Sequence, residues 1–323
     1  MSWFRKKMWL AVEDGWAGWI DTPNSGADAS PTGWGTEATL LNGGGYVANS
    51  WGTHKRYTFE WSDASSRQAA QFMQSLRNGA YGKGLIHFIE PTIYDTNILP
   101  ARVAQPSLMV EDGGRPFVPD TQPVEVQAST PGNGPVIGAR WDLPQNGVQG
   151  YPGRGYSTYI PIPDGYTLLV GAVYSATGSG GVFIRTPDGA DVKIESSSTS
   201  GNPILGSGII DSKGYNVARL WIGRLGIRQS SVTVFSITAR LVPTRKLFVR
   251  GGNPYGTPEY GFGPYGGSEL TPFAKRIMSA PWVGGMGHSG VRFNGTPTLI
   301  HNTGVNGGQV GYAASFIETG SWS

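Results

Sequence analysis

The sequence predicts a mainly β protein built from two domains. Its 323 residues exceed one ordinary domain, for which about 150 residues is a soft guide. It contains 50 glycines and 23 prolines, about twice the ordinary usage, and both residues disfavour helix interiors. Short segments of strand character, separated by turn residues, recur along most of the chain. The predicted order is an N-terminal β domain with one α-helix, followed by a β-sandwich.

Residues 1–115 are predicted to form the N-terminal β domain, with a single helix over 63–78. Apolar residues recur in the helix at i, i+3, i+4 and i+7, so that one face meets a core; they are Ala69, Phe72, Met73 and Leu76. Residues 56–61 alternate strictly between polar and aromatic side chains, as in a half-buried strand. Further strands are expected at 7–12, 37–41 and 85–89.

Residues 116–135 are predicted to be a proline-rich linker between the domains. Prolines at 116, 119, 123, 131 and 135 remove backbone donors and oppose regular strand pairing. The charge balance also changes near residue 125, from an acidic excess before it to a basic excess after it. The domain boundary is therefore placed in this segment.

Residues 136–323 are predicted to form a C-terminal β-sandwich of jelly-roll or galectin-like type. Thr186-Pro-Asp-Gly189 is typical of a hairpin turn between two of its strands. The last 45 residues are expected to complete this sandwich. Residues 251–272, rich in glycine, proline and aromatic residues, are expected to form a long surface loop or an arm. Strands are expected at 166–174, 181–185, 191–195, 217–222, 232–242, 290–293, 296–300 and 309–317.

Composition excludes several classes of protein. The chain has no cysteine, so a disulfide framework, a zinc ribbon and a thiol nucleophile are absent. Basic residues are scattered rather than gathered in a stripe, which argues against nucleic acid as a partner. The apolar run 8–12 after the basic residues 5–7 is too short for an export signal, and no apolar stretch is long enough for a membrane span. We therefore expect a soluble protein without membrane insertion or classical export.

Motifs for catalysis, metal binding or cofactor binding are also weak, and we expect neither an enzyme nor a bound cofactor or metal. The histidines at 54, 87, 288 and 301 lack metal-ligand spacing. Residues 287–291 approach the nucleophile-elbow pattern but have valine at its second glycine. The glycines at 43–45 and 178–181 lack the lysine of a phosphate loop and are predicted to form hairpin turns. A metal site or a carboxylate pair assembled from distant residues stays open.

Aromatic residues near the start of the second domain are the remaining functional candidates. They are interspersed with glycine and proline, and exposed aromatic faces can stack on sugar rings. The alternative is that they fill the edges of the sandwich or contact other subunits. The candidate glycan-binding residues are Trp141, Tyr151, Tyr156 and Tyr159.

Two parts of the sequence resemble minor tail proteins of siphophages that infect actinobacteria. One is Asn78-Gly-Ala-Tyr-Gly-Lys-Gly-Leu-Ile-His-Phe-Ile-Glu-Pro91 with the following segment 95–100. The other is Gly285-Met-Gly-His-Ser-Gly-Val-Arg-Phe293, continued by 304–311 and 318–322. The resemblance covers the two ends of the chain.

The resemblance implies a structural virion protein of the tail tip, assembled in the host cytoplasm and similar in layout to distal tail proteins. In that layout the N-terminal domain forms a ring, and a galectin-like or carbohydrate-binding-module-like sandwich projects outward. A closed ring needs a heterologous interface, so three-fold or six-fold homo-oligomers in contact with other tail-tip proteins are expected. The alternative function is an adhesin module that recognises host cell-envelope glycan.

Overall fold

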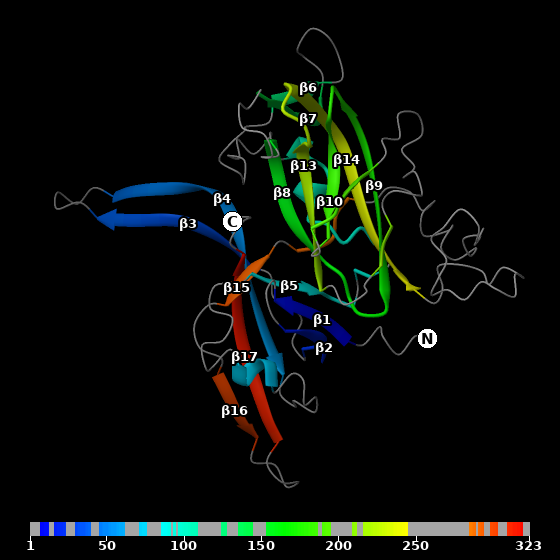
Figure 1. The fold of residues 1–323 in the computed structure, drawn as a ribbon. Helices are drawn as coiled ribbons and strands as arrows, with labels where there is room; N and C mark the ends of the chain where they lie inside the picture. The colour runs from blue at the N-terminus through cyan, green and yellow to red at the C-terminus, as the bar shows by residue number, and fades with distance from the viewer. Residues whose placement is uncertain are drawn as a thin grey trace, which may run out of the picture.

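The computed structural model is mainly β and its sheets are antiparallel, as predicted. The helices among its described residues are short. Strand pairing arranges the chain as one eight-stranded sheet and two smaller sheets that pack on each other (Figure 1). The structure describes residues 7–12, 16–23, 30–39, 45–61, 71–75, 85–91, 93–94, 96–108, 124–127, 135–144, 153–186, 189–194, 209–211, 216–244, 284–288, 290–293, 298–302 and 309–318.

The eight-stranded sheet is built from both ends of the chain. Its strand order is β2-β1-β5-β15-β17-β4-β3, and β16 pairs with β17 beside this path. In Figure 1 the C-terminal strands β15 (orange) and β17 (red) lie between the N-terminal strands β5 (cyan) and β4 (blue). Its strands are β1 (Lys7–Val12), β2 (Ala17–Asp21), β3 (Ser30–Thr39), β4 (Gly45–Trp61), β5 (Ile86–Ile89), β15 (Val291–Phe293), β16 (Thr298–Asn302) and β17 (Gln309–Glu318).

This pairing corrects the prediction that the last 45 residues complete the second sandwich. The strands themselves occur where the sequence predicts them, but β17 pairs with β4 from Tyr312↔Trp61 to Ile317↔Arg56. On its other side β17 pairs with β15, which also contacts β5. The physical reason is burial: the alternate residues Tyr312, Ala314 and Phe316 join the aromatic core of this sheet. The sandwich is thus inserted between two halves of one sheet.

The inserted part consists of two antiparallel sheets that share one core, which we call the sandwich. One sheet has the order β11-β10-β13-β8 and the other β12-β9-β14-β7-β6. The predicted turn 186–189 joins β10 to β11, with Gly189 at φ 89°. The strands are β6 (Val124–Gln127), β7 (Val136–Leu143), β8 (Gly153–Pro161), β9 (Tyr166–Ala176), β10 (Gly180–Arg185), β11 (Asp191–Lys193), β12 (Ile209–Asp211), β13 (Val217–Arg224) and β14 (Ser230–Pro243).

Strand β6 corrects the predicted linker. Val124–Gln127 lies inside the proline-rich segment yet pairs with β7, from Val124↔Arg140 to Gln127↔Val136. Four residues free of proline suffice for this short edge strand, because β6 has a partner on one side only. Of the five prolines in the predicted linker, only Pro135 lies within the described residues, and the predicted loop 251–272 lies outside them.

Two hydrophobic cores meet at strand β1, which is buried on both faces. Met8, Leu10 and Val12 enter a core of aromatic residues on one side of the sheet, where the helical residues 71–75 also pack. Within the predicted helix, Phe72 and Met73 are buried as expected, and Ala69 and Leu76 lie outside the described residues. Trp9 and Ala11 point the other way, into the core of the sandwich. The sheet and the sandwich therefore share buried surface.

Asn97 joins the two parts through hydrogen bonds. It lies just before the short helix α2 (Ala101–Ala104) and is fully buried. Its side chain donates to the Ile237 carbonyl of β14 at 3.0 Å and accepts from the Ala239 backbone N–H at 3.0 Å. Its carbonyl accepts from the Met286 N–H at 2.9 Å. One buried residue thus contacts both the sandwich and the returning C-terminal segment.

Candidate functional site

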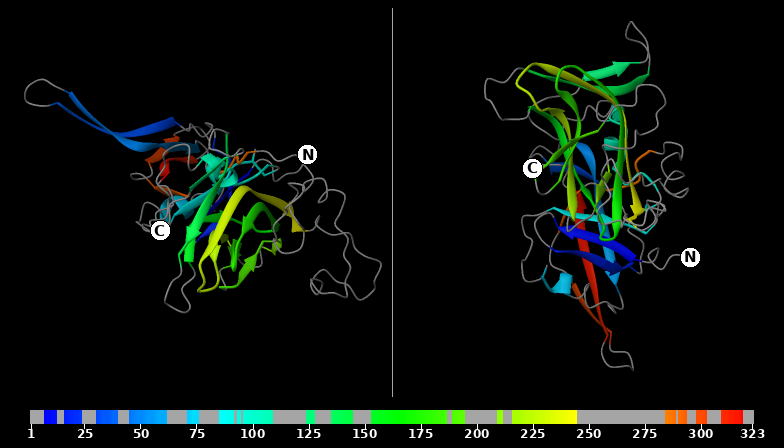
Figure 2. Two further views of the ribbon diagram at one scale, coloured as in Figure 1. Left: turned by 90° about the horizontal axis from the view of Figure 1, so that it is seen from above. Right: turned by 45° about the vertical axis from the view of Figure 1, so that its right-hand side comes forward.

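The most prominent surface feature is a long hairpin made of β3 and β4. Pairing runs from Ser30↔Arg56 to Thr39↔Gly45, with an irregularity between Gly33 and Gly35. Among the described strands, β17 pairs only with the part of β4 from Arg56 onward. The eleven residues before Arg56, at roughly 3.3 Å each, extend about 35 Å beyond the sheet. Figures 1 and 2 show both blue strands leaving the body of the molecule.

The hairpin is poor in charge. Between residues 30 and 53 the only Asp, Glu, Lys or Arg is Glu37, whereas Trp34, Tyr46 and Trp51 supply aromatic rings. Natural sheet edges are usually protected by charged residues, prolines, bulges or short strands. Here Pro31 and the irregularity at Gly33–Gly35 protect the part of β3 nearest the body, so the outer half of the edge carries fewer such protections.

The sequence only partly predicted this hairpin. The glycines at 43–45 indicated a turn, and strands were expected at 37–41 and 56–61. The structure confirms strands on either side of that turn but makes them far longer, 30–39 and 45–61. Tyr46, Val47 and Trp51 are strand-favouring residues and were the available signal. The edge at the far end of the same sheet is β2, which pairs only with β1 among the described strands.

A second cluster joins three titratable side chains around His288. The Tyr57 hydroxyl lies 3.1 Å from His288 Nδ1, and His288 Nε2 lies 3.2 Å from Glu90 Oε1. The imidazole also stacks on Phe88, with ring centroids 4.4 Å apart. Before the histidine, the Gly287 backbone runs so close to Ile98 that a β-carbon would clash with the Ile98 carbonyl. Only glycine fits at this position.

This cluster has the residue types of an acid–base relay. Tyr57 is fully buried, whereas the side chains of His288 and Glu90 are 13% and 25% exposed. Burial, followed by the charges of Glu318 and Glu90, raises the pKa of Tyr57 far above its ordinary value, which keeps the phenol neutral and poorly nucleophilic. Ser289 of the elbow-like motif lies outside the described residues. The cluster fastens the C-terminal segment to the sheet.

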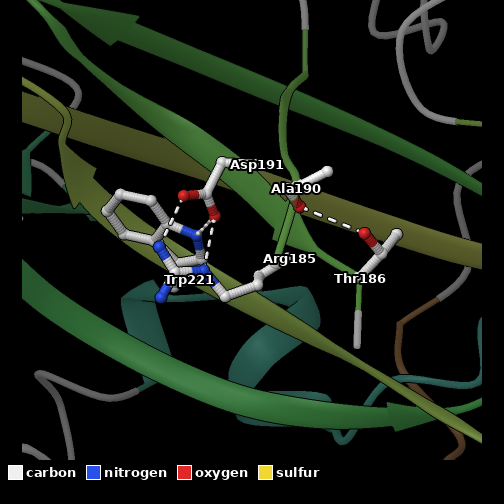
Figure 3. A network of polar contacts seen from close by, with 5 residues as sticks. All are labelled: Arg185, Thr186, Ala190, Asp191 and Trp221. Atoms are coloured by element: carbon white, nitrogen blue, oxygen red, sulfur yellow. Dashed lines mark hydrogen bonds and ion pairs between the residues drawn. The ribbon is translucent and has the colours of Figure 1, made fainter. Parts of the chain in front are cut away.

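A third polar network lies on the outward face of the four-stranded sheet (Figure 3). Arg185 donates two hydrogen bonds to Asp191, Nε to Oδ1 at 2.9 Å and Nη2 to Oδ2 at 2.6 Å. Trp221 Nε1 donates to the same Oδ1 at 3.0 Å. The hydrogen bonding of Arg185 to Asp191 raises the pKa of Arg185. Because Asp191 lies in β11 and Arg185 in β10, the network closes the hairpin around the turn at 186–189.

Two of the predicted glycan-binding aromatic residues are not on the surface. Trp141 and Tyr156 are only 1% and 3% exposed and belong to the core of the sandwich, so the prediction is wrong for both. Ala139, Trp141 and Leu143 are buried and alternate with the more exposed Arg140 and Asp142. This period of two was the signal for an inward position. Tyr159 is half-buried beneath the Arg219 guanidinium, 5.6 Å from its ring centre.

His54, His87 and His301 lie on three different strands. Tyr151 lies outside the described residues, whereas His87 is buried in β5 with its ring 5.8 Å from that of Tyr159. His54 lies on the projecting hairpin and His301 on β16. Within the described part of the chain, no group of three or more histidine, aspartate or glutamate side chains could hold a metal ion. The helices described there are too short to cross a membrane.

Comparisons with known proteins identified no family. Neither protein-family models nor curated proteins nor solved structures match this chain. Of the three features above, the hairpin is the one that extends away from the body.

Proposed function

We propose that this protein is a non-enzymatic structural component of a phage tail tip, a minor tail protein that assembles into a ring in the host cytoplasm and links the tail tube to host-recognition parts. The observation that carries the proposal is the projecting β3–β4 hairpin. An isolated two-stranded hairpin is at best marginally stable in water. A ribbon that extends about 35 Å beyond its sheet is therefore stabilised when another chain packs on it.

The two edges of the eight-stranded sheet supply complementary surfaces for this assembly. The hairpin of one copy adds to the β2 edge of the next, which pairs only with β1 among the described strands, through backbone hydrogen bonds of the kind that extend sheets between chains. Such a contact joins two different surfaces, so it closes into a ring when the rotation per copy divides a full turn. Low charge on the hairpin supports burial because few ions need to be desolvated.

In this proposal the inserted sandwich is of galectin-like or carbohydrate-binding-module-like type and projects outward. Its two sheets share a core that Trp9 and Ala11 of the eight-stranded sheet also enter, and its far end lies a full strand length from that sheet. The burial of Trp141 and Tyr156 removes the observation that favoured glycan recognition. We therefore assign to the sandwich contacts with other tail-tip proteins.

Light scattering on the purified full chain tests the proposal. A ring of three or six copies is expected for the natural sequence. A variant in which residues 33–53 are replaced by an Asn-Gly turn keeps the paired residues near Arg56 and is expected to be a folded monomer, checked by its circular dichroism spectrum. A natural chain that stays monomeric, or a shortened variant that still forms the ring, would contradict the proposal, as would absence of the protein from purified virions.

A further inference from the structure

The end of the sandwich that lies farthest from the eight-stranded sheet carries an unusual turn. Residues 225–229 connect β13 to β14, and we call them the distal turn. Leu225 is 52% exposed and Ile227 is 46% exposed, and both lie in this one turn. Isolated exposed apolar residues are common on protein surfaces, but two large ones on a single short turn form a small apolar tip.

The distal turn is held rigidly. Leu225 N–H donates to the Ser179 carbonyl at 3.3 Å and Gly226 N–H donates to Ser179 Oγ at 3.0 Å, so the turn is fastened to its neighbour between β9 and β10. Arg224 Nη1 donates to the Arg228 carbonyl at 2.6 Å. Because the backbone is already fixed, the two apolar side chains lose little conformational freedom when they contact a partner.

Positive charge accompanies the apolar side chains. Arg228 is exposed, and Arg224 is fully buried directly before the turn. Among the described residues, Arg224 Nε and Nη2 have no hydrogen-bond partner, so a second positive charge lies beneath the turn. Neither the distal turn nor residues 177–179 beside it contain Asp or Glu. The tip is thus apolar and cationic at once.

The position of the distal turn leaves it accessible in the proposed ring. At the other end of β14, Pro243 pairs with Tyr166, whose ring contacts Trp19 and Tyr94 beside the eight-stranded sheet. Fourteen residues of β14, at roughly 3.3 Å each, place the distal turn about 45 Å from that junction. A ring formed by the eight-stranded sheet would therefore present one distal turn per copy on its outside.

We propose that the distal turn contacts the surface of a lipid bilayer with anionic headgroups. Leu225 and Ile227 enter the interfacial region of the bilayer, and Arg228 pairs with headgroup phosphate above it. At membrane surfaces apolar side chains generally insert, whereas cationic side chains stay with the anionic headgroups. Aliphatic side chains offer no ring face for a sugar, which favours lipid over glycan. The contact is peripheral to the bilayer. It rests on the proposed function, because a ring presents several distal turns at once and several weak contacts bind a membrane far more tightly than one.

Vesicle flotation of the full chain tests this inference. The natural chain is expected to float with vesicles of phosphatidylcholine and phosphatidylglycerol and to lose most of that binding with phosphatidylcholine alone or at high salt. The double variant Leu225→Ser, Ile227→Ser is expected to reduce the bound fraction at least tenfold. Val124→Ser, Ile137→Ser is the matched control, because these residues are 44% and 41% exposed elsewhere on the sandwich and leave binding unchanged.

Charge is tested separately with Arg228→Glu, which is expected to abolish binding, and Arg228→Lys, which is expected to preserve it. Arg292→Glu, at an exposed position on β15, is the charge control. Light scattering on the same samples separates the two proposals. A ring that binds none of the vesicles overturns the lipid contact alone, whereas a monomeric protein contradicts the ring. A change in oligomer mass caused by Leu225→Ser, Ile227→Ser without vesicles would show a contact between copies and would also overturn the lipid contact.

Discussion

The eight-stranded sheet and the sandwich use the chain in opposite ways. The sandwich is built from one continuous stretch, β6 to β14, whereas the sheet joins β1–β5 to β15–β17 across the whole inserted sandwich. Their cores differ too: the sheet packs aromatic rings such as Tyr57, Phe59 and Phe316, and the sandwich packs mostly aliphatic side chains. The sheet therefore depends on closing a very long loop, an entropic cost that the sandwich largely avoids.

The largest effect is expected from removing residues 284–323. The deletion takes away β15–β17, exposes the paired edge of β4 and removes Phe316 from the core of the sheet. Truncating one buried aromatic side chain such as Phe316 already costs about 3–5 kcal/mol, and an ordinary domain is stabilised by roughly 5–15 kcal/mol, so the N-terminal sheet is expected to unfold when three strands are lost. Limited proteolysis with mass spectrometry checks this: cleavage is expected within residues 7–61. Protection of those residues, with cleavage in the sandwich instead, would restore the idea that the C-terminal strands complete the sandwich.

A smaller effect tests whether the two parts unfold together. Phe59→Ala in the sheet is expected to lower the free energy of unfolding by about 3–5 kcal/mol, and Ile222→Ala in the sandwich by about 2–5 kcal/mol, because both side chains are fully buried. Trp9 and Ala11 of the sheet lie in the sandwich core, so one shared transition is expected in denaturant for each variant. Two separate transitions, each moved by only one variant, would show that the parts are independent.

The junction itself is tested by Asn97→Ala. This change leaves the Ala239 N–H and the Ile237 carbonyl without their side-chain partner in a buried place. Buried polar groups left without partners cost about 1–3 kcal/mol each, so a loss of about 2–6 kcal/mol is expected for the two. Thr96→Ala is the control, because its hydroxyl contacts the local Ile93 carbonyl at a half-buried site. If the two variants lose the same free energy of unfolding, Asn97 does not connect the two parts.

The contrast between the continuous sandwich and the discontinuous sheet explains how much of the fold the sequence could predict. In the sandwich, local patterns predicted part of the fold: the strand expected at 217–222 is β13, and the turn expected at 186–189 joins β10 to β11, whereas β7 and β8 were not predicted. Residues 309–317 were also predicted as a strand, but the alternation of Tyr312 and Phe316 is the same whichever sheet accepts it. Likewise Tyr57 and His288 are 231 positions apart, and no local spacing connects them. Pairing between distant segments is set by packing, which a single sequence does not display.

The smallest effect concerns alkaline pH and the Tyr57–His288 contact in the sheet. Burial raises the pKa of Tyr57, and likewise that of Tyr94 at the junction with the sandwich. Because the folded state holds these protons more tightly than the unfolded chain, whose tyrosines titrate near pH 10, their contribution is complete below about pH 10 and is lost as the pH rises further. Each proton that only the unfolded chain releases lowers stability by about 1.4 kcal/mol per pH unit.

Tyr57→Phe is therefore expected to cost about 1 kcal/mol at neutral pH, through the lost hydrogen bond to His288, and to make the decline above pH 10 less steep. Urea unfolding at a series of pH values measures both effects. Tyr94→Phe is expected to flatten the same decline, and the double variant flattens it further because the two rings belong to different cores. An unchanged slope in Tyr57→Phe would mean that its hydroxyl exchanges protons freely with solvent. In that case the cluster around His288 would be open enough to act chemically, and the structural role assigned to it would fail.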